Sequence, residues 1–132
     1  MEAIGQMPPS ENRSILAIDD DPAILDLVQF ALEDAGYEVL PAHDGHEALE
    51  LLASVSPSAI LLDMRMPRVN GWEFAKAYSQ KPDPHAPIVV MTAGRDAKDA
   101  ARDIGAECHL SKPFDVDDLI DVVRQCEGRR SA

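Results

Sequence analysis

Short apolar runs alternate with segments of helical periodicity along most of the chain. Three of the runs are continuous, at residues 15–18 (ILAI), 59–62 (AILL) and 88–91 (IVVM). Strands without polar alternation are buried on both faces, which is typical of a parallel sheet covered by helices. Two further runs, at 37–40 and 107–110, are more polar and suit the edges of the same sheet.

A helical pattern follows each run. The first helix is predicted to begin at Pro22, with Asp21 as its N-cap, and to end at Gly36. The other four are predicted from an apolar stripe of Ala48, Leu51, Leu52 and Val55, from residues 71–79, from residues 96–104, and from a stripe of Val116, Leu119, Ile120 and Val123 behind a capping pair, Asp115 and Asp118.

Five β–α units in strict alternation predict an α/β fold with an open, doubly wound parallel sheet. With the polar strands at its edges, the sheet has the flavodoxin-like order 2-1-3-4-5, and ligands are expected at the carboxyl ends of its strands. The length of 132 residues fits one domain, predicted at 14–127. Residues 1–13 and 128–132 are predicted to be flexible tails.

The composition excludes several classes of function. The formal net charge of −12 argues against binding to nucleic acid or to anionic lipid. Cys108 and Cys126 form no C-x-x-C pair, so no disulfide framework is expected. No segment has the pattern of a signal peptide or of a membrane span, so we expect a cytoplasmic protein with reduced thiols.

Chemically useful side chains follow four of the predicted strands. Asp19 and Asp20 come after the first, Asp63 after the third, Thr92 after the fourth and Lys112 after the fifth. Each alone has an ordinary explanation as a turn, strand or surface residue. Together they predict one crevice that holds three carboxylates, a hydroxyl and an amine.

This set of side chains suits phosphoryl transfer. Three neighbouring carboxylates repel one another unless a cation neutralises them, and hard oxygen ligands favour Mg²⁺. A carboxylate can attack phosphorus to form an aspartyl phosphate. Lys112 supplies a positive charge for one phosphoryl oxygen, and Thr92 can donate a hydrogen bond to another.

Four motifs in order resemble the receiver domain of the two-component response regulators. The motifs are ILAIDDDP at 15–22, LLDMRMPRVNG at 61–71, VVMTAG at 89–94 and LSKPF at 110–114. The resemblance covers residues 14–126, and it implies a phosphorylation-controlled signalling domain rather than a conventional enzyme.

The resemblance also implies a role for each residue around the acceptor. Asp63 would be the phosphoacceptor, and Asp20 would bind Mg²⁺ directly, with Asp19 assisting, often through water. Arg65 would offer its backbone carbonyl to the metal. Arg65 and Gly94 hold two positions whose side chains tune the lifetime of the phosphoryl group in this family, and the sequence leaves open the direction of the effect here.

The same resemblance assigns the switch. Thr92 and Lys112 would sense and clamp the phosphoryl group, and the bond from Lys112 to Pro113 would be cis. His109 occupies the place of the family's usual switching tyrosine or phenylalanine. Histidine is smaller than these residues and titratable. The alternative is that His109 is an ordinary edge-strand residue without a switching role.

The expected donor is a histidine kinase or a histidine phosphotransfer protein, and the expected readout is a protein contact on the face made by the fourth helix, fifth strand and fifth helix. Nothing that resembles a DNA-binding module follows Cys126, so we expect a free-standing regulator, a phosphorelay intermediate or a motility-type effector. Two alternatives stay open: a phosphate-independent adaptor of this fold, and a receiver fragment of a longer regulator.

Two other functions are less consistent with the sequence. A flavin or nucleotide carrier would need a glycine-rich phosphate loop after the first strand, where three consecutive aspartates stand at 19–21. A phosphatase with an aspartate nucleophile would usually carry a second aspartate at the position of Arg65.

Overall fold

The computed structural model describes residues 13–82, 84–93 and 96–127. The predicted tails therefore lie outside the described residues, apart from Arg13, as does Gly94.

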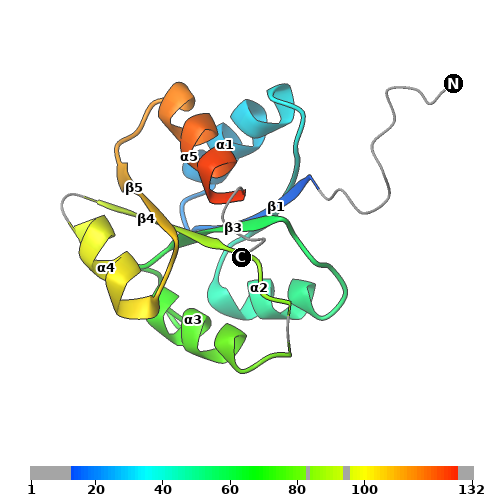
Figure 1. Ribbon diagram of the computed structural model, residues 1–132, viewed down its shortest axis with the longest axis vertical. Helices are drawn as coiled ribbons and strands as arrows, with labels where there is room; N and C mark the ends of the chain where they lie inside the picture. The colour runs from blue at the N-terminus through cyan, green and yellow to red at the C-terminus, as the bar shows by residue number, and fades with distance from the viewer. Residues whose placement is uncertain (1–12, 83, 94–95, 128–132) are drawn as a thin grey trace, which may run out of the picture.

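The described residues form five parallel strands and five helices in strict alternation (Figure 1). The strands are β1 (Ser14–Ile18), β2 (Glu38–Ala42), β3 (Ala59–Asp63), β4 (Ile88–Ala93) and β5 (Cys108–Lys112). The helices are α1 (Pro22–Asp34), α2 (Gly45–Leu52), α3 (Gly71–Ser79), α4 (Asp96–Ile104) and α5 (Val116–Glu127). The strand order β2-β1-β3-β4-β5 confirms the predicted topology.

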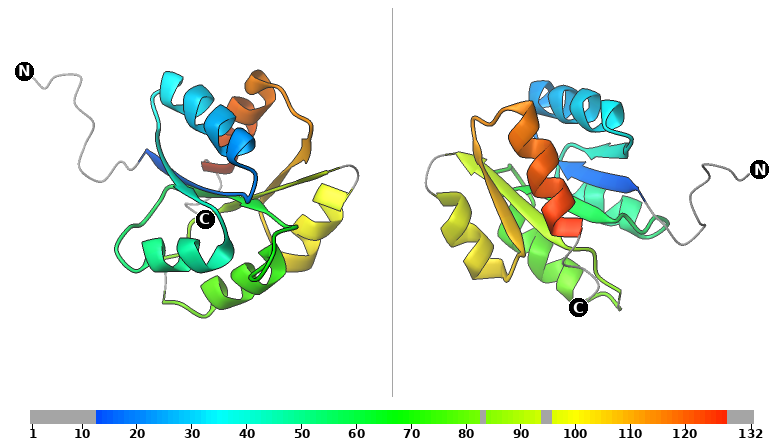
Figure 2. Two further views of the ribbon diagram at one scale, coloured as in Figure 1. Left: turned by 180° about the vertical axis from the view of Figure 1, so that it is seen from behind. Right: turned by 45° about the horizontal axis from the view of Figure 1, so that its top comes forward.

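Helices cover both faces of the sheet. In Figure 1, α1 and α5 lie above the sheet and α2, α3 and α4 below it, and the views in Figure 2 show the same division. Alternate residues of each central strand enter opposite cores, so that Ile15 packs with α1 and α5 while Leu16 packs with the other three helices. This two-sided burial is why the central strands are continuously apolar.

The structure corrects the predicted bounds of three elements and the orientation of one side chain. Helix α2 ends at Leu52, so Val55 lies beyond it, and the two edge strands begin one residue later than predicted. Val116 does not belong to the buried stripe: it is 37% exposed because it is the first residue of α5, before the turns that pack on the sheet. Leu119 and Val123 are fully buried, as predicted.

The end of α5 is bound to the start of the sheet by a polar network. The hydroxyl of Tyr37 donates to Glu127 Oε1 at 2.8 Å, and Ser58 donates to Glu127 Oε2 at 2.7 Å. Burial and the neighbouring carboxylate raise the pKa of Tyr37 to about 12, so its hydroxyl stays a donor at neutral pH.

The loop between β3 and α3 contacts the start of α3 on one side and the N-cap of α2 on the other. Its Met64 is fully buried, and the Gly71 amide donates to the Met64 carbonyl at 3.1 Å. A Cβ on Gly71 would stand 2.5 Å from Met64 Sδ, so glycine is required for this close approach. On the other side Arg68, with φ of 63°, forms an ion pair with Asp44, the N-cap of α2.

Replacing Gly71 by alanine tests the close contact between Gly71 and Met64. Alanine normally stabilises a helical position relative to glycine. Here the clash with Met64 should instead lower the free energy of unfolding by about 1–3 kcal/mol. Chemical denaturation measures this change, and the Met64 methyl resonance should move.

Gly105→Ala is the control, because that glycine has φ of 69° and no atom near its missing Cβ. It should cost stability through backbone strain alone and leave the Met64 resonance in place. A Gly71→Ala protein as stable as the parent would show that the contact between Gly71 and Met64 does not require glycine.

Candidate functional site

The predicted carboxylates meet at the carboxyl ends of β1 and β3. Asp19 and Asp20 directly follow β1, and Asp63 is the last residue of β3. One carboxylate oxygen from each lies within 4.8 Å of the others. Asp19 and Asp63 are buried and Asp20 is exposed, so this acidic cluster, called the pocket below, is open to solvent at Asp20.

Lys112 joins this cluster from the end of β5. Its Nζ lies 2.6 Å from Asp19 Oδ2 and 3.6 Å from Asp63 Oδ1. The other Asp19 oxygen, Oδ1, accepts from the Asp21 amide at 2.9 Å. Asp19 is thus fully buried with a partner on each oxygen, which offsets much of the cost of burying its charge.

Asp63 has weaker compensation. Its Oδ1 accepts a long 3.4 Å hydrogen bond from the Arg65 amide, and Lys112 lies no closer than 3.6 Å. Burial and the negative charge of Asp19 raise the pKa of Asp63 from 3.8 to about 6, against the opposing effect of Lys112. The repulsion is therefore concentrated on the residue at the centre of the pocket.

The donor set fits a hard divalent cation. All three donors are carboxylates, two of them buried, and the exposed Asp20 leaves an open side where water can complete the coordination. A cation would also remove the repulsion that raises the pKa of Asp63. No cysteine or histidine belongs to this cluster, so its chemistry suits Mg²⁺ rather than zinc.

The other predicted residues lie on or next to β4 and β5. Thr92 is buried near the end of β4 and pairs in register with Ser111 of β5. The bond from Lys112 to Pro113 is cis, as the resemblance implied. His109 lies on β5 with an exposed side chain, away from both cores.

One interaction at the mouth of the pocket was not predicted. The side chain of Arg65 points to α4, where its Nη2 lies 2.7 Å from Asp96 Oδ2. The two residues are 31 positions apart. An aspartate at the first position of a helix looks like an ordinary N-terminal charge, so this pairing could not be predicted from the sequence.

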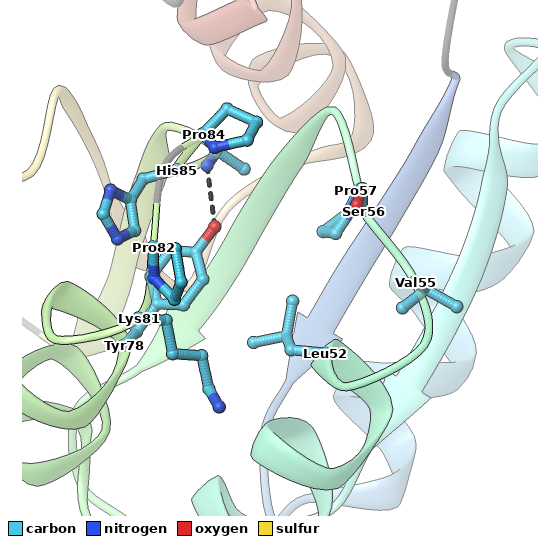
Figure 3. Close-up of a pocket in the computed structure, with 10 residues that line it drawn as sticks. Leu52, Val55, Ser56, Pro57, Tyr78, Lys81, Pro82, Pro84 and His85 are labelled. Atoms are coloured by element: carbon cyan, nitrogen blue, oxygen red, sulfur yellow. Dashed lines mark hydrogen bonds between the residues drawn. The ribbon is translucent and has the colours of Figure 1, made fainter.

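A separate cavity lies at the opposite end of the strands (Figure 3). It has a volume of about 330 Å³ and is formed by the segments that precede β3 and β4, including Pro57, Pro82 and Pro84. The Tyr78 ring lines it, and the Tyr78 hydroxyl accepts from the Ala86 amide at 2.7 Å. None of the aspartates described above lines this cavity.

The raised pKa of Asp63 predicts a pH-dependent effect of Asp63→Asn. Between pH 4 and 6 the folded chain retains a proton that the unfolded chain releases, so Asp63 lowers stability as pH rises through this range. Without metal, Asp63→Asn should raise the free energy of unfolding by about 1–3 kcal/mol at pH 7.5 and change it little at pH 4.

Chemical denaturation in a chelator at both pH values measures the effect. Asp121→Asn, which removes an exposed carboxylate of α5, controls for the loss of one negative charge. An Asp63→Asn protein less stable than the parent at pH 7.5 would contradict the proposed repulsion.

Comparison with known proteins finds response regulators. The family model of the response regulator receiver domain matches residues 15–124. Response regulator MprA of Mycobacterium ulcerans (strain Agy99) is 41% identical over 108 residues, which are 80% of this chain and 46% of MprA. The DNA-binding dual master transcriptional regulator RpaA of Synechocystis is 39% identical over 113 residues, 83% of this chain and 47% of RpaA.

Solved structures show the same similarity. Chemotaxis response regulator CheY4 of Vibrio cholerae superposes with a TM-score of 0.81 at 33% identity, covering 88% of this chain and 99% of that one. A putative response regulator of Chloroflexus aurantiacus J-10-fl gives 0.83 at 31% identity, covering 90% of this chain and all of the other.

Two further observations concern the length of the chain and its helices. The chain spans about half the length of the curated relatives it matches. Within the part of the chain that the structure describes, no helix is both long and apolar enough to cross a bilayer.

Receiver domains are phosphorylated on an aspartate, generally bind Mg²⁺ at an acidic pocket and interact with histidine kinases. From its fold, its four motifs and these matches, the chain belongs to the receiver domains of the two-component response regulators.

Proposed function

We propose that Asp63 is the phosphoacceptor of this receiver domain. The observation that carries the proposal is the position of Lys112 Nζ, 2.6 Å from Asp19 and 3.6 Å from Asp63. An ammonium there offsets part of the negative charge before the reaction and is within reach of a phosphoryl oxygen after it. Of the two buried carboxylates, Asp63 has the fewer close contacts and so is the freer nucleophile.

The reaction is a displacement at phosphorus. An oxygen of the Asp63 carboxylate attacks the phosphorus of a phosphohistidine, and the bond from phosphorus to the imidazole nitrogen breaks. The released imidazole takes a proton from solvent. Thr92 donates its hydroxyl hydrogen to one phosphoryl oxygen, and Lys112 contacts another.

Mg²⁺ is the proposed cofactor, held by Asp19, Asp20, Asp63 and the backbone carbonyl of Arg65. When bound, it neutralises charge on the transferring phosphoryl group. The exposed carboxylate of Asp20 is accessible to an incoming hydrated ion, whereas the buried Asp19 is already bonded to Lys112. Asp20 is therefore proposed as the main direct ligand and Asp19 as an assisting one.

The proposed donor is a histidine kinase or a histidine phosphotransfer protein, and the proposed location is the cytoplasm. Output is proposed to run through protein contacts on the face of α4, β5 and α5. The exposed His109 on β5 lies on this face, with the exposed Ser111 two residues on. Movement of Thr92 towards the phosphoryl group would shift the population of two arrangements of that face.

A second candidate role is the receiver part of a longer regulator. It is favoured by the match to RpaA, a DNA-binding protein of which this chain spans about half. The net charge of −12 makes direct DNA contact by this receiver domain unfavourable, so nucleic-acid binding would require additional sequence.

Phosphorylation is tested with acetyl phosphate and Mg²⁺. Intact mass spectrometry should show a gain of one phosphoryl group. The gain should be absent when the metal is chelated before acetyl phosphate is added, and absent in Asp63→Asn. Asp121→Asn is a suitable control, because it removes an exposed carboxylate of α5 that is not part of the acidic cluster. A chain that stays unmodified, or an Asp63→Asn protein that gains the same mass, would refute the assignment and favour the phosphate-independent adaptor.

Metal binding is tested by exchanging neighbouring carboxylates. Asp20→Asn should weaken Mg²⁺ binding at least about tenfold in isothermal titration calorimetry, because it removes a direct ligand. Asp21→Asn is the matched control: Asp21 caps α1 by accepting from the Ala23 amide, and asparagine preserves that cap. Equal affinities of the two variants would show that Asp20 is not a ligand.

A further inference from the structure

The ion pair between Arg65 and Asp96 connects the acceptor loop to the output face. Arg65 lies two residues after Asp63, and its amide donates to the Asp63 carboxylate. Asp96 is the first residue of α4. Their side chains are 64% and 59% exposed, so the pair lies on the surface at the mouth of the pocket.

The Arg65 guanidinium has two possible anionic partners, Asp96 and a phosphoryl group on Asp63. In the structure its guanidinium contacts Asp96 at 2.7 Å, while the pocket already contains the ammonium of Lys112. A phosphoryl group on Asp63 would add a charge of about −1.5 to −2 and three strong acceptor oxygens beside the Arg65 backbone. Guanidinium binds such oxygens in a bidentate manner and more strongly than it binds an exposed carboxylate.

We propose that Asp96 is a positioning residue that holds Arg65 away from the acceptor, and that phosphorylation of Asp63 transfers Arg65 from Asp96 to the phosphoryl oxygens. The inference rests on the proposed function of Asp63. Its consequence is that the start of α4 loses a tether to the β3–α3 loop when the domain is phosphorylated. The same contact that favours the phosphoryl group thus releases an element of the proposed output face.

The coupling must be reciprocal. If the phosphoryl group weakens the pair, the pair must weaken binding of the phosphoryl group by the same factor. An exposed ion pair corresponds to a factor of about 1.5 to 5 in an equilibrium constant. Breaking the pair from the Asp96 side should therefore favour the phosphorylated state by that factor.

Helix α4 offers a matched control. Asp96 and Asp99 both lie in its first turn, and both can stabilise the helix through its dipole. Asp99 pairs instead with Arg102, at 3.7 Å. Asp99→Asn therefore removes the same charge from the same turn without touching Arg65.

The test uses beryllofluoride, a mimic of the phosphoryl group, in the presence of Mg²⁺. Asp96→Asn should bind it about 1.5 to 5 times more tightly than the parent, whereas Asp99→Asn should bind it with the parent's affinity. In an Arg65→Gln background, Asp96→Asn should have no effect. Equal effects of Asp96→Asn and Asp99→Asn, or an Asp96→Asn effect that persists without Arg65, would overturn the inference.

Hydrogen exchange supplies a second readout. Beryllofluoride should speed exchange of the first hydrogen-bonded amides of α4, from Ala100 onwards, in the parent and leave them unchanged in Arg65→Gln, where no tether remains to be released. The same response in both proteins would overturn the inference. Failure of the parent to bind beryllofluoride at all would instead overturn the proposed function of Asp63, and this inference with it.

Discussion

The repulsion between buried carboxylates is the constraint on which the site depends. Asp19 and Asp63 are both removed from water, and the single ammonium of Lys112 lies closer to the first than to the second. Burial, together with the negative charge of Asp19 that Lys112 only partly offsets, raises the pKa of Asp63 to about 6. A pocket with this unmet charge attracts a cation and favours any arrangement that brings further positive charge to Asp63.

The fold makes this unfavourable arrangement tolerable. Parallel strands that are apolar on both faces give two large cores, which supply the stability that the pocket reduces. The loop after Asp63 is held from two sides, by the contact between Gly71 and Met64 and by the ion pair between Arg68 and Asp44. The loop that follows the acceptor is therefore bound to α3 and α2, while Arg65 within it reaches the surface.

Much of this could be predicted from the sequence, because it follows from periodicity along single elements. Uniformly apolar strands predicted the parallel sheet, and the order of the sheet placed Asp63 near Lys112. The pairing of Arg65 with Asp96 could not be predicted, since it depends on how the β3–α3 loop and the start of α4 meet in space. The exposure of Val116 was missed because a helical stripe does not show which turn first reaches the sheet.

The central claim is that Asp63 accepts the phosphoryl group with Lys112 as its partner. A crystal structure with Mg²⁺ and beryllofluoride tests it most directly. The account predicts beryllium bonded to an Asp63 carboxylate oxygen, with Lys112 Nζ in contact with a fluorine and the cation between Asp20 and Asp63. Beryllofluoride bound to another side chain, or Lys112 bonded only to Asp19 with the group in place, would contradict it.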